Sequence, residues 1–308
     1  MSRDLRIVLL GPGGQIGWEL TRALVAISTV LPLDRARADL RDTVALRAAV
    51  RRLQPDAIIN AAAYTDVDGA ENDRSTAFAV NATAPAALAE VAAAEHALLV
   101  HFSTDYVFDG SAHRPYTEQD PTSPLGVYGE TKREGERAIL ETGADALIFR
   151  TSWVYGVRGR NFLSTIRRLG RTGEPLRVVD DQVGAPTWSR AVAEAVASVL
   201  ARIAYHDGFA LPRAAGGIYH LTASGETSWH GFAREILERD PAIASSRPFT
   251  LQPIASHAFP RPARRPAYSV LDNGRIASAF GIRLPHWVHL LDLALAPNAE
   301  GPETPARG

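Results

Sequence analysis

The first half of the chain alternates short apolar segments with helix-forming segments, and this alternation limits the fold more than any other feature of the sequence. Each apolar run is short and is expected to form a strand. Strands that alternate with helices form βαβ units, whose parallel sheet is covered by helices on both faces. The sequence therefore predicts an α/β fold with a Rossmann-type doubly wound parallel sheet. The expected strands cover residues 5–10, 29–33, 56–60, 98–103 and 146–150, and the expected helices cover 14–27, 43–53 and 75–95.

A glycine-rich turn follows the first expected strand and leads into the first expected helix, with the spacing G-x-x-G-x-x-G. Glycines at such a turn let the backbone bend tightly and approach a pyrophosphate closely. The N-terminus of the following helix offers free N–H groups and a positive dipole end to the phosphates. The turn therefore predicts a dinucleotide site built from Gly11, Gly13, Gly14, Gln15, Ile16 and Gly17.

An acid and an arginine follow the second expected strand. Asp34 is suited to accept hydrogen bonds from the ribose hydroxyls of NAD, and Arg35 is suited to the 2′-phosphate of NADP. NADPH and NADH are therefore both expected as cofactors. Asp39 and Leu40 are expected to border the adenine, with a solvated acidic-basic turn as the alternative for Asp39.

The pattern loosens after Arg150, where glycine and proline become more frequent. Helices are expected at 160–169 and 187–203, a strand at 218–222, and an ordered surface loop at the Pro-Arg-rich stretch 259–266.

Two domains and a tail are expected from a chain of 308 residues. An NAD(P)-binding Rossmann domain is expected over residues 1–150, with later segments returning to it. Residues 151–296 are expected to form mainly a smaller, less regular C-terminal substrate lobe, and residues 297–308 a flexible tail.

Lys132 is the only lysine among the 33 basic residues of the chain, and it stands four residues after Tyr128. Residues i and i+4 of a helix lie on one face, about 5–6 Å apart. The ammonium is then expected to lower the pKa of the phenol from near 10 towards neutrality. A tyrosine tuned in this way can exchange a proton with a substrate oxygen. The alternative is a surface pair on a polar helix.

Three further segments end expected strands, where ligands of open α/β sheets bind. They are the stretch Ala62-Ala63-Tyr64-Thr65, whose small residues let a nicotinamide ribose approach the backbone, and the single residues Thr104 and Trp153. Thr104, Tyr128 and Lys132 form a set in which one group polarises a carbonyl, one transfers a proton and one holds charge. All of these residues are expected to share one crevice with the glycine turn.

The composition excludes several kinds of protein. The net charge is -1 without a basic face or a charge run, so neither nucleic acid nor a membrane surface is an expected partner. Cysteine is absent, which excludes disulfides and thiolate metal sites and fits the cytoplasm. No apolar run is expected to reach the length of a membrane span. Asp180-Asp181 is expected to form a structural turn, His101 to be a packed core residue, and His286 with His289 not to bind zinc.

From about Arg6 to Leu293 the chain resembles the dTDP-4-dehydrorhamnose reductases, a family of extended short-chain dehydrogenases/reductases, and six strings together carry the resemblance. The strings are Gly14–Gly17, Asn60–Thr65, Phe102–Gly110, Tyr128–Lys132, Arg150–Gly156 and Asp180–Thr187.

The resemblance implies that NAD(P)H delivers hydride to C4 of dTDP-4-dehydro-β-L-rhamnose while Tyr128 supplies the proton, giving dTDP-L-rhamnose. It implies that Thr104 and Lys132 assist Tyr128, and that Asp105 and Trp153 hold the sugar. Some members of the family dimerise through a magnesium ion held by acidic residues. This sequence offers no full matching set of acidic ligands, so no metal site is predicted and a homodimer stays an open expectation.

Two other interpretations stay open. One is a related sugar-nucleotide epimerase or dehydratase. The other is a non-catalytic binding subunit on the same scaffold, similar to the regulatory subunit of methionine adenosyltransferase. The presence of Thr104, Tyr128 and Lys132 favours the enzyme, because a scaffold has no need of them. Two interpretations also stay open for Arg264-Arg265: the two arginines bind the substrate diphosphate, or they belong to a solvated surface loop.

Overall fold

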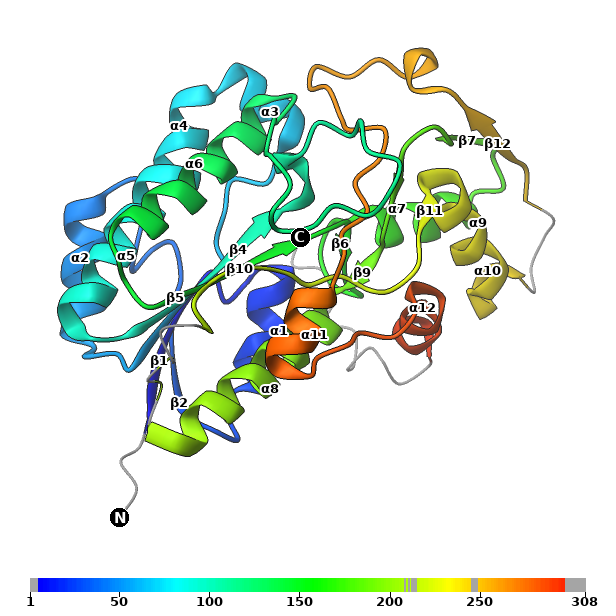
Figure 1. The fold of residues 1–308 in the computed structure, drawn as a ribbon. Helices are drawn as coiled ribbons and strands as arrows, with labels where there is room; N and C mark the ends of the chain where they lie inside the picture. Colours follow the sequence, from blue (N-terminus) through cyan, green and yellow to red (C-terminus); the bar gives the residue numbers. More distant parts are fainter. Residues whose placement is uncertain (1–4, 208, 210, 212–214, 245–248, 297–308) are drawn as a thin grey trace.

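A six-stranded sheet forms the centre of the protein in the computed structural model (Figure 1). The structure describes residues 5–207, 209, 211, 215–244 and 249–296, so the expected tail at 297–308 lies outside it. All neighbouring strands are parallel, in the order β10-β5-β4-β3-β1-β2. The predicted doubly wound sheet is confirmed. Its strands are β1 (Arg6–Leu10), β2 (Thr29–Leu33), β3 (Ala57–Asn60), β4 (Leu98–Thr104), β5 (Ala146–Thr151) and β10 (Gly217–His220).

Helices bury both faces of this sheet, which is why its strands are continuous apolar runs. Ile7 and Leu9 of β1 face one apolar core, and Val8 and Leu10 face the other. The first core is closed by α1 (Gln15–Ala23), α8 (Ser189–Asp207) and α11 (Gly274–Phe280). The second is closed by α2 (Thr43–Arg52), α5 (Ala84–Glu95) and α6 (Val127–Glu141), the last carrying Tyr128 and Lys132.

The expected helix at 75–95 is one apolar segment with a local defect. It consists of α4 (Arg74–Phe78), the π-helical turn η1 (Ala79–Thr83) and α5. The expectation that no apolar run reaches the length of a membrane span is wrong here, because Arg74–Glu95 is long and apolar enough by composition. More than half of its most apolar window is buried inside the fold, as in the core helix of a globular domain.

Several segments from the second half return to the sheet. Strand β10 pairs with β5, with Ile218 opposite Ile148, and confirms the strand expected near 218–222. Helix α8 packs against α1, and α11 packs against β10. The sheet is therefore completed by residues far along the chain.

Most of the remaining elements form a second lobe beside the carboxyl ends of the strands (Figure 1). Its core includes Tyr155, Trp188, Phe232 and Trp287. Strand β7 pairs in parallel with β12 across a long sequence separation. The lobe contains α7 (Phe162–Gly170), β7 (Leu176–Val179), α9 (Trp229–Arg239), α10 (Pro241–Ala244), β12 (Leu251–Ile254) and α12 (Trp287–Leu295), with the short paired strands β6 (Val154–Tyr155) and β9 (Thr187–Trp188), and β8 (Val183–Gly184) and β11 (Thr227–Ser228).

Local interactions explain where helix α3 begins and where helix α1 ends. Helix α3 (Val67–Asn72), which the sequence pattern did not predict, begins after Asp66, whose carboxylate accepts a hydrogen bond from the Gly69 N–H. Helix α1 is shorter than the expected helix at 14–27, and its last turn closes on Leu24, whose carbonyl accepts hydrogen bonds from Ile27 and Ser28.

Candidate functional site

A cavity of about 790 Å³ opens at the carboxyl ends of β1, β3 and β4. Ten of the residues predicted for a cofactor site line it, which brings together segments that are more than 100 positions apart. They are Gly11, Gly13, Gly14, Gln15, Ile16, Ala62, Ala63, Thr65, Tyr128 and Lys132.

The glycine turn is close-packed at two positions and open at a third. Gly11 has φ +75°, and a Cβ there would lie 2.8 Å from the Ala62 nitrogen. A Cβ on Gly17 would lie 2.0 Å from the Gly11 carbonyl oxygen, so helix α1 meets the turn at backbone distance. A Cβ on Gly13 would meet no atom within 4 Å, so Gly13 faces free space in the cavity.

Two polar atoms in the wall of the main cavity lack a protein partner. Gln15 Oε1 and Ser103 Oγ are buried, and within the described part of the chain neither has a hydrogen-bond partner. Buried polar groups are rarely left unpaired, because each costs about 1–3 kcal/mol. These two unpaired polar atoms and the glycine turn therefore fit a polar ligand such as a dinucleotide.

The residues predicted to hold the adenosine end lie outside the lining of this cavity. Asp34 Oδ1 accepts a hydrogen bond from the Arg37 N–H, and Arg35 has a side chain that is 75% exposed. The Arg41 guanidinium, 2.6 Å from Asp39, lowers the pKa of that carboxyl to about 2. Leu40 is buried in the core under α2.

Tyr64 also lies outside the cavity lining. Its backbone N–H donates to Asn81 Oδ1 at 2.9 Å, and its ring packs against Ala70, Ala77 and Val127. These contacts hold the Ala62–Thr65 segment against α6.

Lys132 is 2% exposed and points into the sheet. Its ammonium donates to the Phe102 carbonyl at 2.5 Å and lies 3.3 Å from His101 Nε2. Burial lowers the pKa of Lys132 to about 8, although the nearby Glu136 carboxylate acts in the opposite direction. The sole lysine of the chain is thus a buried amine on the cavity wall.

The expectation that Lys132 lowers the pKa of Tyr128 is wrong for this structure. Burial raises the pKa of Tyr128 to about 12, and the nearby Asp105 carboxylate also raises it, while a hydrogen bond with Thr104 lowers it. The ammonium of Lys132 is directed at Phe102 and His101 instead. Tyr128 therefore carries its proton at neutral pH.

Thr104 and Asp105 extend the polar set beside Tyr128. The Thr104 hydroxyl donates to Asp105 Oδ1 at 3.1 Å, and the Ser152 hydroxyl donates to Asp105 Oδ2 at 3.1 Å. Asp105 is 2% exposed, and burial raises its pKa to about 6. Ser269 also hydrogen-bonds to this carboxyl.

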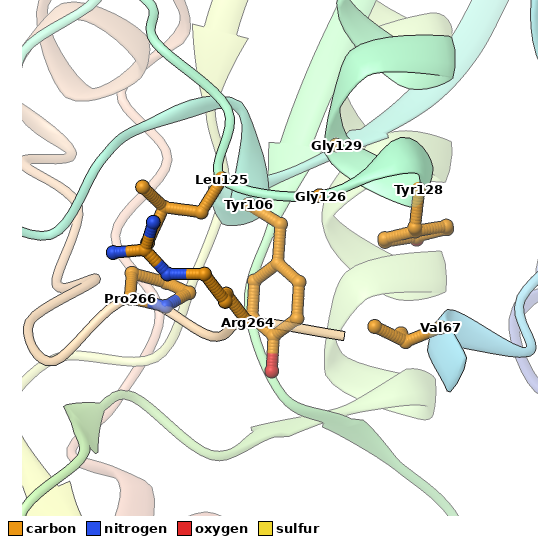
Figure 2. Close-up of a pocket in the computed structure, with 8 residues that line it drawn as sticks. All are labelled: Val67, Tyr106, Leu125, Gly126, Tyr128, Gly129, Arg264 and Pro266. Atoms are coloured by element: carbon orange, nitrogen blue, oxygen red, sulfur yellow. The ribbon is translucent and has the colours of Figure 1, made fainter. Parts of the chain in front are cut away.

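Tyr128 separates the main cavity from the second lobe. A small gap of about 10 Å³ lies on its other side, against the loop after β12. Figure 2 shows Arg264 and Pro266 on one side of this gap, Tyr128 and Val67 on the other, and Tyr106 between them. The phenol therefore stands where a cofactor-sized cavity meets the second lobe.

A second large cavity, of about 850 Å³, lies in that lobe. Arg264 and Arg265 line it, and Arg265 is held by Asp68 at 2.9 Å. The expected ordered loop at 259–266 thus forms part of a cavity wall. Further polar and charged residues of the wall are Arg177, Asp181, Gln182, His257 and Arg261.

Trp153 joins the end of β5 to this lobe. Its φ is +47°, an unusual value for a bulky residue and one that marks backbone strain. The indole stacks on Trp229 with ring centroids 3.5 Å apart, and it lies so close to Gly184 that a Cβ there would be 2.5 Å away. Trp229 in turn lines the second cavity.

Sequence reasoning missed the far wall of the main cavity. Arg158 and Arg160 line it, together with Trp18 and Glu19. Arg158 and Arg22 lie on the Trp18 ring at 4.0 and 3.6 Å from its centroid, which fixes the loop after β6 against α1. The only sequence signal was the pair of arginines in the stretch 156–160.

The described residues contain no group of three or more His, Asp or Glu side chains placed to hold a metal ion. The described residues therefore do not fit the magnesium site that the family resemblance raised. Asp181 accepts hydrogen bonds from Ser256, and Asp180 from the hydroxyl of Ser228, the residue that caps α9. Both carboxylates are thus engaged in structural hydrogen bonds.

The parallel sheet, the glycine turn and the Thr104, Tyr128 and Lys132 set define a short-chain dehydrogenase/reductase of the extended type. Residues 5–299 match the family model described as the RmlD substrate binding domain. The chain belongs to the dTDP-4-dehydrorhamnose reductase family.

Several relatives support this placement. A dTDP-4-dehydrorhamnose reductase of Burkholderia thailandensis is 45% identical, covering 94% of this chain and 98% of its own. One from Escherichia coli K12 is 41% identical, covering 92% and 94%. A crystal structure of a dTDP-4-dehydrorhamnose reductase from Clostridium acetobutylicum has a TM-score of 0.86 at 36% identity, covering 94% and 98%. One from Bacillus anthracis, in complex with NADP, has a TM-score of 0.86 at 30% identity, covering 95% and 99%.

Proposed function

We propose that this protein reduces the C4 keto group of dTDP-4-dehydro-β-L-rhamnose to give dTDP-L-rhamnose, with NADPH or NADH as the hydride donor. The observation that carries the proposal is the position of Tyr128, a protonated phenol on the wall between the main cavity and the second lobe. A proton donor at that place can serve a substrate that enters from the lobe while the cofactor lies over the sheet.

The main cavity is proposed to bind the cofactor. The pyrophosphate fits against the glycine turn and the N-terminus of α1, where Gly13 leaves free space. The segment Ala62–Thr65 and Lys132 are proposed to border the nicotinamide ribose. Asp34, Arg35, Asp39 and Leu40 are proposed to meet the adenosine end, as the sequence suggested. When bound, the reduced nicotinamide supplies hydride.

Tyr128 supplies the proton in this proposal. Because burial holds its pKa near 12, the phenol is fully protonated at neutral pH and ready to donate to the oxygen that becomes a hydroxyl. Thr104, hydrogen-bonded to the phenol, can donate to the same oxygen as negative charge develops there, once its hydroxyl proton turns away from Asp105 Oδ1. Both groups act within a buried wall, where hydrogen bonds are stronger than in water.

The second cavity is proposed to bind the nucleotide part of the substrate. Arg264 and Arg265 line it, and a guanidinium fork matches the oxygens of a diphosphate. Asp105, whose charge acts on Tyr128, and Trp153, which stacks on Trp229 of this cavity's wall, are proposed to hold the sugar. A division into a cofactor domain over 1–150 with returning segments and a substrate lobe over 151–296 follows from this arrangement. We also propose a cytoplasmic homodimer.

The test is to mix the protein with dTDP-4-dehydro-β-L-rhamnose and NADPH and to follow the absorbance of NADPH, identifying the product by NMR. Tyr128→Phe is the matched control, because it removes only a hydroxyl; the turnover should fall by about 10²–10⁴. An epimerase or dehydratase would convert a nucleotide sugar without net oxidation of NADPH. A non-catalytic subunit would bind NADPH without consuming it, and either result would refute the proposal.

A further inference from the structure

Three buried polar side chains, those of Asn60, His101 and Lys132, form consecutive contacts from the sheet to the cavity wall. Asn60 of β3 and His101 of β4 are partners in the sheet register, and each is 1% exposed. Asn60 Nδ2 lies 3.2 Å from His101 Nδ1, and His101 Nε2 lies 3.3 Å from Lys132 Nζ. Nothing in the cofactor or substrate assignment requires the first two residues.

The backbone determines which way this chain of hydrogen bonds is directed. The Ala62 N–H donates to Asn60 Oδ1 at 3.2 Å, so the amide oxygen is an acceptor there and the amide nitrogen faces His101. An NH₂ group only donates, so His101 Nδ1 accepts through its lone pair. Burial lowers the pKa of His101 well below its usual value, and the ring is neutral. Its single proton then lies on Nε2, towards Lys132.

This arrangement affects the two protonation states of Lys132 differently. A neutral amine can accept the Nε2–H, whereas an ammonium, which only donates, cannot. Burial acts in the same direction, and Glu136, one turn along α6 and paired with Arg150 at 2.6 Å, acts against it. Tyr128, one turn earlier, is a neutral phenol. The other charged side chains on the cavity wall are Glu19, Arg158 and Arg160.

We propose that Asn60 and His101 are positioning residues that set how firmly Lys132 holds its proton, the amide by fixing the imidazole tautomer and the imidazole by presenting its N–H to the amine. The inference rests on the role proposed above for Tyr128. Once the phenol O–H bond breaks and the proton moves to the substrate oxygen, the phenolate must regain a proton. Lys132 lines the same cavity as Tyr128 and can supply a loosely held proton through water in that cavity. The resulting neutral amine accepts the imidazole N–H.

Lys132 then regains a proton from water, since it lines the open cavity. Asn60 and His101 do not themselves carry protons to solvent, because their chain ends at the Ala62 N–H. Their effect is confined to the proton affinity of the lysine.

The sole lysine makes a direct test available. Protein grown with lysine labelled at the side chain and lacking any lysine in a tag gives one side-chain NMR signal, that of Lys132. Its titration in the wild type should have a midpoint well below the ordinary value of about 10.4. Ring ¹⁵N shifts of His101 should show a protonated Nε2 and a bare Nδ1.

Asn60→Asp reverses the direction of the hydrogen bonds from residue 60 through His101 to Lys132, and the side chain at position 60 keeps almost the same shape. The carboxylate still accepts from the Ala62 N–H and favours the tautomer in which His101 Nδ1–H donates to it, which leaves Nε2 free to accept from the ammonium. The Lys132 midpoint should rise by about one pH unit or more, and the alkaline limb of the pH–rate profile should move with it. A merely structural role for Asn60 would lower stability or turnover at all pH values and leave both midpoints in place.

Two results would overturn the inference. One is a proton on His101 Nδ1 in the wild type, which decides the matter even if the variant does not fold. The other is an unchanged Lys132 titration in a folded Asn60→Asp protein. Because both readouts are independent of turnover, an absence of reductase activity would count against the proposed function alone.

Discussion

Replacing Gly17 by alanine tests the backbone contact between helix α1 and the glycine turn. The new methyl carbon would lie 2.0 Å from the Gly11 oxygen, 2.8 Å from the Gly11 carbonyl carbon and 3.2 Å from the Pro12 Cα. All three neighbours are backbone atoms, so no side chain can rotate away. Helix and turn must separate by about 1 Å before the closest contact reaches 3.0 Å.

The separation has two expected costs. Overpacking of this kind destabilises a core by about 1–3 kcal/mol, because the α1 side of the sheet must shift with the helix. The helix N-terminus also moves away from the pyrophosphate position, so the affinity for NADPH should fall by about tenfold or more. Urea unfolding measures the first effect and a fluorescence titration with NADPH measures the second.

Gly13→Ala is the matched control in the same turn. Its methyl group meets no atom within 4 Å, so the stability should stay within about 0.5 kcal/mol of the wild type. Its affinity for NADPH should still fall, because the methyl group enters the space proposed for the pyrophosphate. If Gly17→Ala matches the wild type in both measurements, or if Gly13→Ala unfolds as easily as Gly17→Ala, the account of this turn is wrong.

Three further predictions concern charged side chains. Lys132→Arg should lose most of its turnover, because a wider planar group must fit where the amine lies 2.5 Å from the Phe102 carbonyl, and near wild-type rates would mean that the sole lysine is a compositional accident. Arg35→Ala should raise the KM for NADPH by about tenfold and leave that for NADH nearly unchanged, since only NADPH carries a 2′-phosphate; equal losses would place Arg35 away from that phosphate. Asp105→Asn should stabilise the protein at about pH 8 by on the order of 3 kcal/mol. The folded pKa of Asp105 is raised from 3.8 to about 6, so its stabilising contribution is complete below the lower value and lost as the pH rises through the higher one. Urea midpoints of the two proteins should therefore converge below about pH 4, and a constant difference at every pH would contradict the shifted pKa.

The central sheet was predictable because both of its faces are buried. A strand such as β1 must then be apolar at successive positions, from Ile7 to Leu10, and this run is visible without a partner. The second lobe has no such local signal. Strands β7 and β12 are four residues each and pair across a separation of 75 positions, with Leu251 opposite Leu176.

In the candidate site, too, local patterns were predictable from the sequence and long-range contacts were not. The glycine turn and the Tyr128–Lys132 spacing are local patterns, and the structure brings both to one cavity. The direction of the Lys132 side chain depends on contacts with Phe102 and His101 from a strand about 30 positions earlier, so the expected effect on the pKa of Tyr128 was wrong. The stacking of Trp153 on Trp229 is likewise a long-range contact that no local pattern encodes.

Strand β10 is synthesised about 70 residues after its partner β5, and this order affects how the chain folds during synthesis. Until residues 217–220 emerge, β5 is an edge strand with unpaired backbone groups and an apolar side chain, Phe149, on an open surface. The face later covered by α8 and α11 also stays exposed until residues 189–280 are made. An N-terminal fragment ending near residue 150 would therefore expose both an unpaired strand edge and an apolar face of the sheet. Such a fragment should self-associate, and the intact chain should gain its cooperative stability only after most of it has left the ribosome.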